Sequence, residues 1–258
     1  MRIRHLVVAT DASLDGNHAV RVAQSVGERI GAKVTPLLVH FPLPAGVAST
    51  PFAPIVEELP AGTAVTEGIP AIEIVRFAET QAADLIVLSR SPRDYTSVLT
   101  LGDTVDAVIR RTEIPCLVVP AGQQRFARLV AALDGSERGM AVFQQAWQFR
   151  RLSEAGLSAI FVEPLPEGEH AGLATVPSAR GPHLALAMGV LLAGRAAVPL
   201  IQRQGEVVAQ VTDGLSAVGG DVLMVGVRRG GPAGLSGSTG IGRRLIAAAP
   251  CAVLTVPL

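Results

Sequence analysis

Short apolar runs alternate with longer amphipathic stretches along the whole chain. The runs are rich in Val, Ile and Leu, as strands buried on both faces of a parallel sheet are. In the first half they are Ile3–Ala9, Val34–Val39, Ala64–Thr66, Leu85–Leu88 and Cys116–Val119. In the second half they are Leu129–Leu133, Ala159–Val162, Val198–Ile201, Val222–Val225 and Ala252–Val256. Their regular alternation with helical stretches predicts an α/β fold with parallel sheets and right-handed crossovers.

Local signals set the limits of the first helices. Ser13 or Asp15 can cap a helix that runs to about Ile30, and Gly31 stops it. Pro70 starts a second helix, because proline is favoured in the first helical turn. The apolar stripe of that helix includes Ile72, Val75 and Ala82.

The two halves of the chain resemble each other. LVVATDAS at Leu6–Ser13 matches LVAALDGS at Leu129–Ser136, 123 positions later. ADLIVLS at Ala83–Ser89 matches GDVLMVG at Gly220–Gly226, 137 positions later. The second half is therefore longer by 14 residues, inserted between its second and third strands.

The repeat predicts two domains, residues 1–122 and 125–258. The segment Phe41–Pro60 is rich in proline and small residues where the second half has LALAMGVLLAG, so the first domain's second helix should be shortened or missing. Each last strand would leave an exposed edge on its own. We therefore expect two five-stranded parallel sheets, with helices on both faces, packed as a pseudo-dimer through Cys116–Val119 and Ala252–Val256.

Composition narrows the function classes. The 258 residues are 49% apolar and 17% charged, which suffices for a sizeable core. Lys+Arg and Asp+Glu both number 22 and aromatics make up 3%, so no nucleic-acid partner is expected. The apolar N-terminal run and Leu184–Gly194 are too short for a signal peptide and a membrane span, so we expect a cytoplasmic protein. Cys116 and Cys251 are expected to be buried, reduced thiols rather than a reactive or bridged pair.

Candidate ligand contacts lie after the first and fourth strands of each half, where open α/β sheets bind ligands. Asp11 and Asp134 follow the first strands and could cap a helix or contact a ligand's base or a metal. The loops after the fourth strands read SRSPRDYTSVLTLGD from Ser89 and GVRRGGPAGLSGSTGIGRR from Gly226. Zinc-binding spacings, a nucleophile elbow, a P-loop and a dinucleotide fingerprint are absent from the sequence.

Together with the stretch Val65–Pro70, these signatures resemble the universal stress protein family, and the duplication resembles its tandem members. The resemblance covers nearly the whole chain. It implies an adenine-nucleotide alpha-hydrolase-like fold with strand order 3-2-1-4-5 in each half. Family members that bind ATP do so with a loop G-x2-G-x9-G-(S/T). Its glycines let amides approach phosphates, and its end stands at a helix N-terminus, which favours anions.

The first loop keeps this spacing but not its chemistry. Pro92 stands at the second glycine position and removes an N–H donor. Asp103 follows Gly102 where a hydroxyl residue is expected, and puts a carboxylate where phosphate would bind. The first half is therefore expected to have lost ATP.

The second loop keeps many glycines and hydroxyls and has no acidic residue. The resemblance implies a set of ATP contacts, with a magnesium ion only together with ATP. They are Asp134, Val162, Gly226, Arg229, Ser238, Thr239 and Gly240. Asp134 and the backbone of Val162 would flank the adenine. Gly226 and Arg229 would lie near the ribose and phosphates. Ser238, Thr239 and Gly240 would meet the terminal phosphates. Arg229 either fills the pocket in place of glycine or pairs with phosphate.

Three functions are compatible with these features. The first is a stress-response or regulatory module of the universal stress protein type, with ATP in the second half only. The second is a protein-interaction module, which binds an unknown protein partner and no nucleotide. The departures in both loops favour this second function. The third, a nucleotide hydrolase, has no identifiable base beyond Asp134. The resemblance implies binding or regulation rather than an assigned reaction, and the sequence leaves further dimerisation of the whole chain open.

Overall fold

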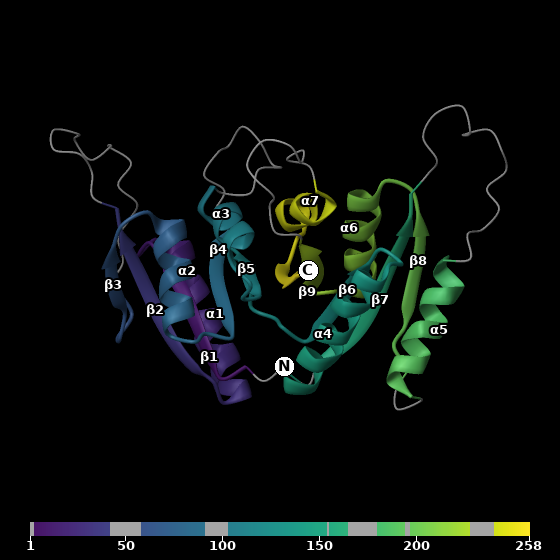
Figure 1. Cartoon of the computed structure of the whole chain (residues 1–258), viewed down its shortest axis with the longest axis horizontal. Helices are drawn as coiled ribbons and strands as arrows, with labels where there is room; N and C mark the ends of the chain where they lie inside the picture. The colour runs from purple at the N-terminus through teal and green to yellow at the C-terminus, as the bar shows by residue number, and fades with distance from the viewer. Residues whose placement is uncertain are drawn as a thin grey trace.

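The computed structural model describes residues 3–41, 58–90, 103–153, 155–164, 180–193, 197–227 and 240–258. Its centre is one ten-stranded sheet in the order β3-β2-β1-β4-β5-β10-β9-β6-β7-β8 (Figure 1). Numbered within each half, the strands follow the predicted order 3-2-1-4-5 from either edge. Among the described strands, neighbours within a half are parallel and the central pair β5–β10 is antiparallel.

The elements of the first half agree closely with the apolar runs. Its strands are β1 (His5–Thr10), β2 (Lys33–His40), β3 (Ala64–Glu67), β4 (Leu85–Arg90) and β5 (Cys116–Pro120). Its helices are α1 (Leu14–Ile30), α2 (Pro70–Thr80) and α3 (Asp103–Arg111). The expected caps of α1 are present, because the Ser13 side chain accepts a hydrogen bond from the Gly16 amide and Gly31 adopts φ 67°.

The second half repeats this arrangement. Its strands are β6 (Arg128–Leu133), β7 (Gly156–Glu163), β8 (Leu200–Gln204), β9 (Val222–Val227) and β10 (Ala252–Pro257). Its helices are α4 (Glu137–Ser153), α5 (Arg180–Leu192), α6 (Val207–Val218) and α7 (Ile241–Ala248). Helix α5 stands where the first half has residues 42–57, so the expected shortening of the first domain's second helix lies outside the described residues. The division into domains at 1–122 and 125–258 stays a prediction.

Two sequence-based details need correction. Strand β8 begins at Leu200 rather than Val198, because Pro199 has no N–H to donate to a neighbouring strand. The buried face of α2 consists of Ala71, Ile74, Val75 and Ala78. Ile72 lies on the adjacent face and is 46% exposed, and Ala82 lies beyond the helix end.

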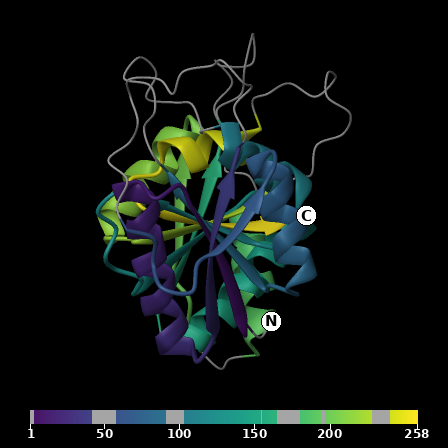
Figure 2. The ribbon, with the colours of Figure 1, turned by 90° about the vertical axis from the view of Figure 1, so that its left-hand side faces the viewer.

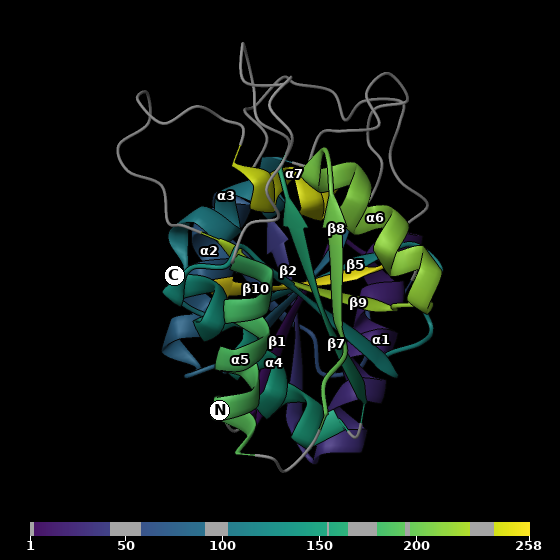
Figure 3. The same ribbon diagram turned by 90° about the vertical axis from the view of Figure 1, so that its right-hand side faces the viewer.

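Helices cover both faces of the sheet (Figures 2 and 3). Helices α1, α4 and α5 pack over one apolar layer, which contains Leu6 and Val8. Helices α2, α3, α6 and α7 pack over the other, which contains Val7. Successive strand residues point to opposite faces, so strands covered on both sides must be apolar throughout.

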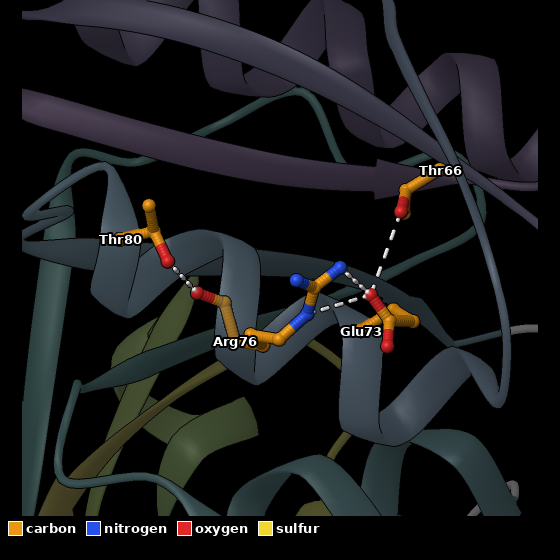
Figure 4. Close-up of polar contacts among 4 residues, drawn as sticks. All are labelled: Thr66, Glu73, Arg76 and Thr80. Atoms are coloured by element: carbon orange, nitrogen blue, oxygen red, sulfur yellow. Dashed lines mark hydrogen bonds and ion pairs between the residues drawn. The ribbon is translucent and has the colours of Figure 1, made fainter.

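The turn into α2 shows why a glycine precedes this helix. Glu73 accepts hydrogen bonds from Thr66 on β3 and from Arg76, while the Thr80 hydroxyl donates to the Arg76 carbonyl (Figure 4). Gly68 adopts φ 141°, and a Cβ there would lie 2.8 Å from Cγ of Glu73. The equivalent turn in the second half has Gly205 at φ 135°.

The two halves meet through their last strands, as expected. Val118 pairs with Val253 and Leu117 with Leu254, so the predicted parallel sheets are joined edge to edge as one sheet. All four side chains are buried. The Cys116 amide donates a 2.9 Å hydrogen bond to the hydroxyl of Thr255, which is also buried. A side chain on β10 thus supplies an acceptor to β5 beyond the paired residues.

Both cysteines are free and buried. Burial raises the pKa of the Cys116 thiol to about 12 and that of Cys251 to about 11. Both thiols therefore stay protonated in the folded protein near neutral pH, in agreement with the expectation of inert, reduced cysteines.

We predict that Thr255→Val lowers the free energy of unfolding by about 1–3 kcal/mol, because it keeps the volume but leaves the buried Cys116 amide without an acceptor. Urea denaturation measures this. Thr212→Val, on helix α6, is the control, since its hydroxyl bonds only carbonyls of its own helix. Equal effects of the two substitutions would contradict the role of Thr255 at the joint.

We also predict that neither thiol of the native protein reacts with Ellman's reagent at pH 8, whereas both react at once in denaturant. The raised pKa of each thiol leaves little thiolate, and burial blocks access. The absorbance of the released chromophore counts the reacting groups. Rapid labelling of a thiol in the folded chain would overturn this assignment.

Candidate functional site

The carboxyl ends of β7, β6 and β9 lie side by side in the second half. Leu133 at the end of β6 pairs with Phe161, so the next residue, Asp134, is level with Val162. On the other side Ala131 pairs with Met224, which brings the end of β6 level with Gly226. These adjacent strand ends form one edge of the sheet, which is where doubly wound folds bind ligands.

Helix α7 begins at the same edge. A Cβ on Gly242, in its first turn, would lie 2.8 Å from the Gly226 carbonyl oxygen, so the helix start lies directly against β9. The structure therefore brings Asp134, Val162, Gly226 and Gly240 to one edge. The other predicted contacts, Arg229, Ser238 and Thr239, lie outside the described residues, as do Pro92 and Gly102 of the first loop. Asp103, the other departure of the first loop, is the first residue of α3.

Asp134 is held by a tight turn. Its Oδ1 accepts hydrogen bonds from the Ser136 amide at 3.0 Å and from the Ser136 hydroxyl at 2.6 Å. The Ser136 Oγ in turn accepts from the Gly139 amide at 3.2 Å, in the first turn of α4. Within the described part of the chain, Oδ2 of this exposed carboxylate accepts no hydrogen bond. Asp134 thus has a structural role through one oxygen and an acceptor to offer through the other.

The first half contains the same turn. Asp11 accepts from the amide and hydroxyl of Ser13, whose Oγ accepts from the Gly16 amide. A Cβ at Gly16 or at Gly139 would lie 2.6 Å from Oδ1 of the aspartate before it. The motif is therefore Asp-x-Ser-x-x-Gly, and sequence reasoning missed its glycine. The signal was available, because the two glycines are also 123 positions apart.

Val162 and Gly226 contribute backbone rather than side chains to this edge. The Val162 side chain is buried in the core, so only its main chain is available at the strand end. A Cβ on Gly226 would collide with the Leu258 side chain and lie 3.0 Å from Cγ2 of Val142. The missing side chain at Gly226 therefore has a packing explanation, independent of any ligand.

Among the described residues, the N-terminus of α7 is open. Gly240 is its N-cap, and in that part of the chain no side chain caps it and nothing lies within 4 Å of the position of a Cβ on Gly240. The amides of Arg243 and Arg244 bond the Gly240 carbonyl, but among the described residues no acceptor meets the amides of the first turn. Unpaired amides and the helix dipole favour an anion at this position. In the first half, the equivalent helix α3 begins with Asp103.

The nearby arginines point to carboxylates. Arg243 Nε lies 2.5 Å from Oδ1 of Asp106, and Arg244 Nη2 lies 2.7 Å from Oε1 of Glu206. Glu206 also accepts from the Ala209 amide, and this bond above all, with Arg244, holds the pKa of its carboxyl below its ordinary value. The guanidinium groups of α7 are therefore engaged within the protein. Among the described residues, no three His, Cys, Asp or Glu side chains gather to hold a metal ion.

The described helices include none that is both long enough and apolar enough to cross a membrane.

Comparisons with known proteins support one family. Residues 2–120 match the model of the Universal stress protein family. Over 57 residues the chain is 42% identical to Universal stress protein MJ0531 of Methanocaldococcus jannaschii, a match that covers 22% of this chain and 34% of that relative. The match thus spans about a third of the relative's length.

Solved structures that resemble the whole chain include the following two. A universal stress protein from Archaeoglobus fulgidus gives a TM-score of 0.70 at 14% identity, covering 100% of this chain and 99% of its own. A Pseudomonas aeruginosa UCBPP-PA14 protein provisionally described as a universal stress protein gives 0.72 at 17% identity, covering 99% and 93%. At these identities the likeness is one of fold.

We predict that Gly139→Ala lowers the free energy of unfolding by about 1–3 kcal/mol, because the new methyl overlaps Asp134. Gly16→Ala should do the same in the first half. Gly189→Ala on α5 is the matched control. It meets nothing within 4 Å, so alanine should raise stability by up to about 1 kcal/mol. Thermal denaturation of the three variants separates the collision from a general effect of alanine.

Proposed function

Because residues 2–120 belong to the universal stress protein family, we propose that the chain is a stress-response or regulatory module of tandem type whose second half alone binds ATP. The observation that carries this proposal is the open N-terminus of α7 at Gly240, on the same sheet edge as the exposed carboxylate of Asp134. In this proposal the two halves form a pseudo-dimer within one chain, and the module works in the cytoplasm.

The chemistry of the edge suits an adenine nucleotide. Oδ2 of Asp134 can accept a hydrogen bond from the exocyclic amine of adenine, next to the main chain of Val162. The amides at Gly240 can donate to a phosphate. Arg229, Ser238 and Thr239 belong to the proposed site on the sequence resemblance alone. A magnesium ion would arrive with the phosphates, as is usual for this cation.

The same reasoning favours one site per chain. Asp103 begins α3 at the position equivalent to Gly240, so the first half has an acidic residue where the second half has a glycine. A negative charge at this position would repel a phosphate.

A specific observation also favours the second candidate, a protein-interaction module. Leu186 and Val190 lie one turn apart on the outer face of α5 and are 68% and 73% exposed. A helix that is apolar on its outer face as well as its inner one is usually covered by another molecule. The packing explanation for Gly226 removes one argument for a nucleotide and leaves this alternative in play.

Calorimetric titration tests the ATP site. We predict one ATP per chain, and at least tenfold weaker binding in Gly240→Asp, equivalent to about 1.4 kcal/mol, because the added carboxylate repels phosphate. Gly240→Ala is the control, since its methyl enters open space and adds no charge. Asp134→Asn should weaken ATP but not inorganic tripolyphosphate, which has no base. If the wild-type chain binds no ATP at millimolar concentration, the interaction module replaces this proposal.

A further inference from the structure

We propose that the first half holds α7 at both ends and thereby fixes the open amides at Gly240 for the second half's ligand. This inference rests on the proposed function. Helices α3 and α7 lie at the same end of the molecule, above the β5–β10 joint (Figure 1). Three described residues of the two halves carry the argument: Arg90, Asp106 and Arg243.

Arg90 holds the C-terminal end of α7. It is the last residue of β4, and its side chain reaches across to the second half. Nη1 donates to the Ile246 carbonyl at 2.7 Å, and Nη2 donates to the Ala249 carbonyl at 2.7 Å. These carbonyls have no amide partners further along the helix, so a cation at this end also complements the helix dipole. Arg90 is thus the C-terminal cap of a helix that belongs to the other half.

Asp106 holds the other end. It lies in α3, is 5% exposed, and pairs through Oδ1 with Arg243 at 2.5 Å and through Oδ2 with Arg110 at 2.8 Å. Arg243 is the third residue of α7, and the open amides are those before it. The ion pair with Arg243 joins the two helices, whereas Arg110 lies on the same helix as Asp106. Breaking a pair that involves a buried carboxylate is costly, so this contact holds the start of α7 against α3.

The repeat shows that these contacts run one way. The residue equivalent to Arg90 in the second half is Val227, which cannot donate a hydrogen bond. The residue equivalent to Asp106 is Arg243 itself, 137 positions later. A symmetric dimer of either half would therefore place two aspartates or two arginines together, whereas the fused chain pairs one of each. The first half, whose helix α3 begins with Asp103, thus supports the start of α7 in the second half.

Hydrogen exchange of the full chain tests this support directly. Arg90→Val, which copies Val227, and Arg243→Met should each make the amides of α7 exchange at least tenfold faster. Two matched controls remove similar contacts elsewhere. Arg110→Met takes the other arginine from Asp106, and Arg128→Met removes a guanidinium from the Val218 carbonyl at the end of α6. Neither control should change exchange in α7.

Titration of the same variants with ATP and with tripolyphosphate supplies a second measurement. Arg90→Val and Arg243→Met should weaken both ligands at least fivefold, and Arg90→Lys, which keeps the charge, should recover part of the loss. Unchanged exchange in α7 would overturn the proposal whatever the chain binds. Faster exchange with unchanged affinities would overturn the positioning role. If the wild type binds no ATP, the proposed function fails, and exchange alone decides whether the first half holds α7.

Discussion

The pairing of β5 with β10 is the constraint on which the rest of the molecule depends. Each strand is apolar and would be the exposed edge of a five-stranded sheet, with its amides and carbonyls open to another chain. Pairing Val118 with Val253 and Leu117 with Leu254 removes both edges at once. The pairing also fixes the positions of the helices of one half relative to those of the other, because in each half the last strand is the one at the joint. Helices α3 and α7 come into contact range only because of this joint.

The joint brings equivalent positions of the two halves into contact. A difference in residue type between such positions therefore changes the contacts between the halves. Identical charges at positions 106 and 243 would repel at short range in a partly buried environment, and the aspartate–arginine pair replaces that repulsion by attraction. Arg90 adds bonds that its counterpart Val227 cannot return. The two halves are therefore complementary rather than interchangeable. The first half supplies Arg90 and Asp106, and the second half supplies the helix that they contact.

Much of this fold could be predicted from the sequence. Strands buried on both faces appear in the sequence as uninterrupted apolar runs. Because the sequence is duplicated, each run in one half could be checked against its counterpart in the other. The failures have physical causes. Pro199 moved the start of β8 to Leu200. Of the stripe predicted for α2, Val75 lies on the buried face but Ile72 does not, because apolar residues at 71, 72, 74, 75 and 78 allow more than one buried face. The partner of Arg243 could not be found at all, since Asp106 is distant in sequence and meets it only across the joint. Asp134 was recognisable as a candidate, but the use of one of its oxygens by Ser136 required coordinates.

The start of α7 differs from the starts of α1, α2 and α6 in a way that local stability does not explain. Helix α1 has Ser13 as its cap, and α6 has Glu206, each accepting an amide of the first turn. Helix α2 has no side-chain cap, but Pro70 at its start removes one of the donors that would need one. Helix α7 has neither device, although a capping side chain typically contributes about 1 kcal/mol. An anion at Gly240 would supply the acceptors that capping side chains supply elsewhere, and the contacts from Arg90 and Asp106 would keep this helix ordered until it arrives. In the proposed site, the first half holds the rest of α7 while the amides at its start stay unpaired. A permanent cap would compete with the ligand for these amides, so this arrangement is the one expected of a site that exchanges its ligand.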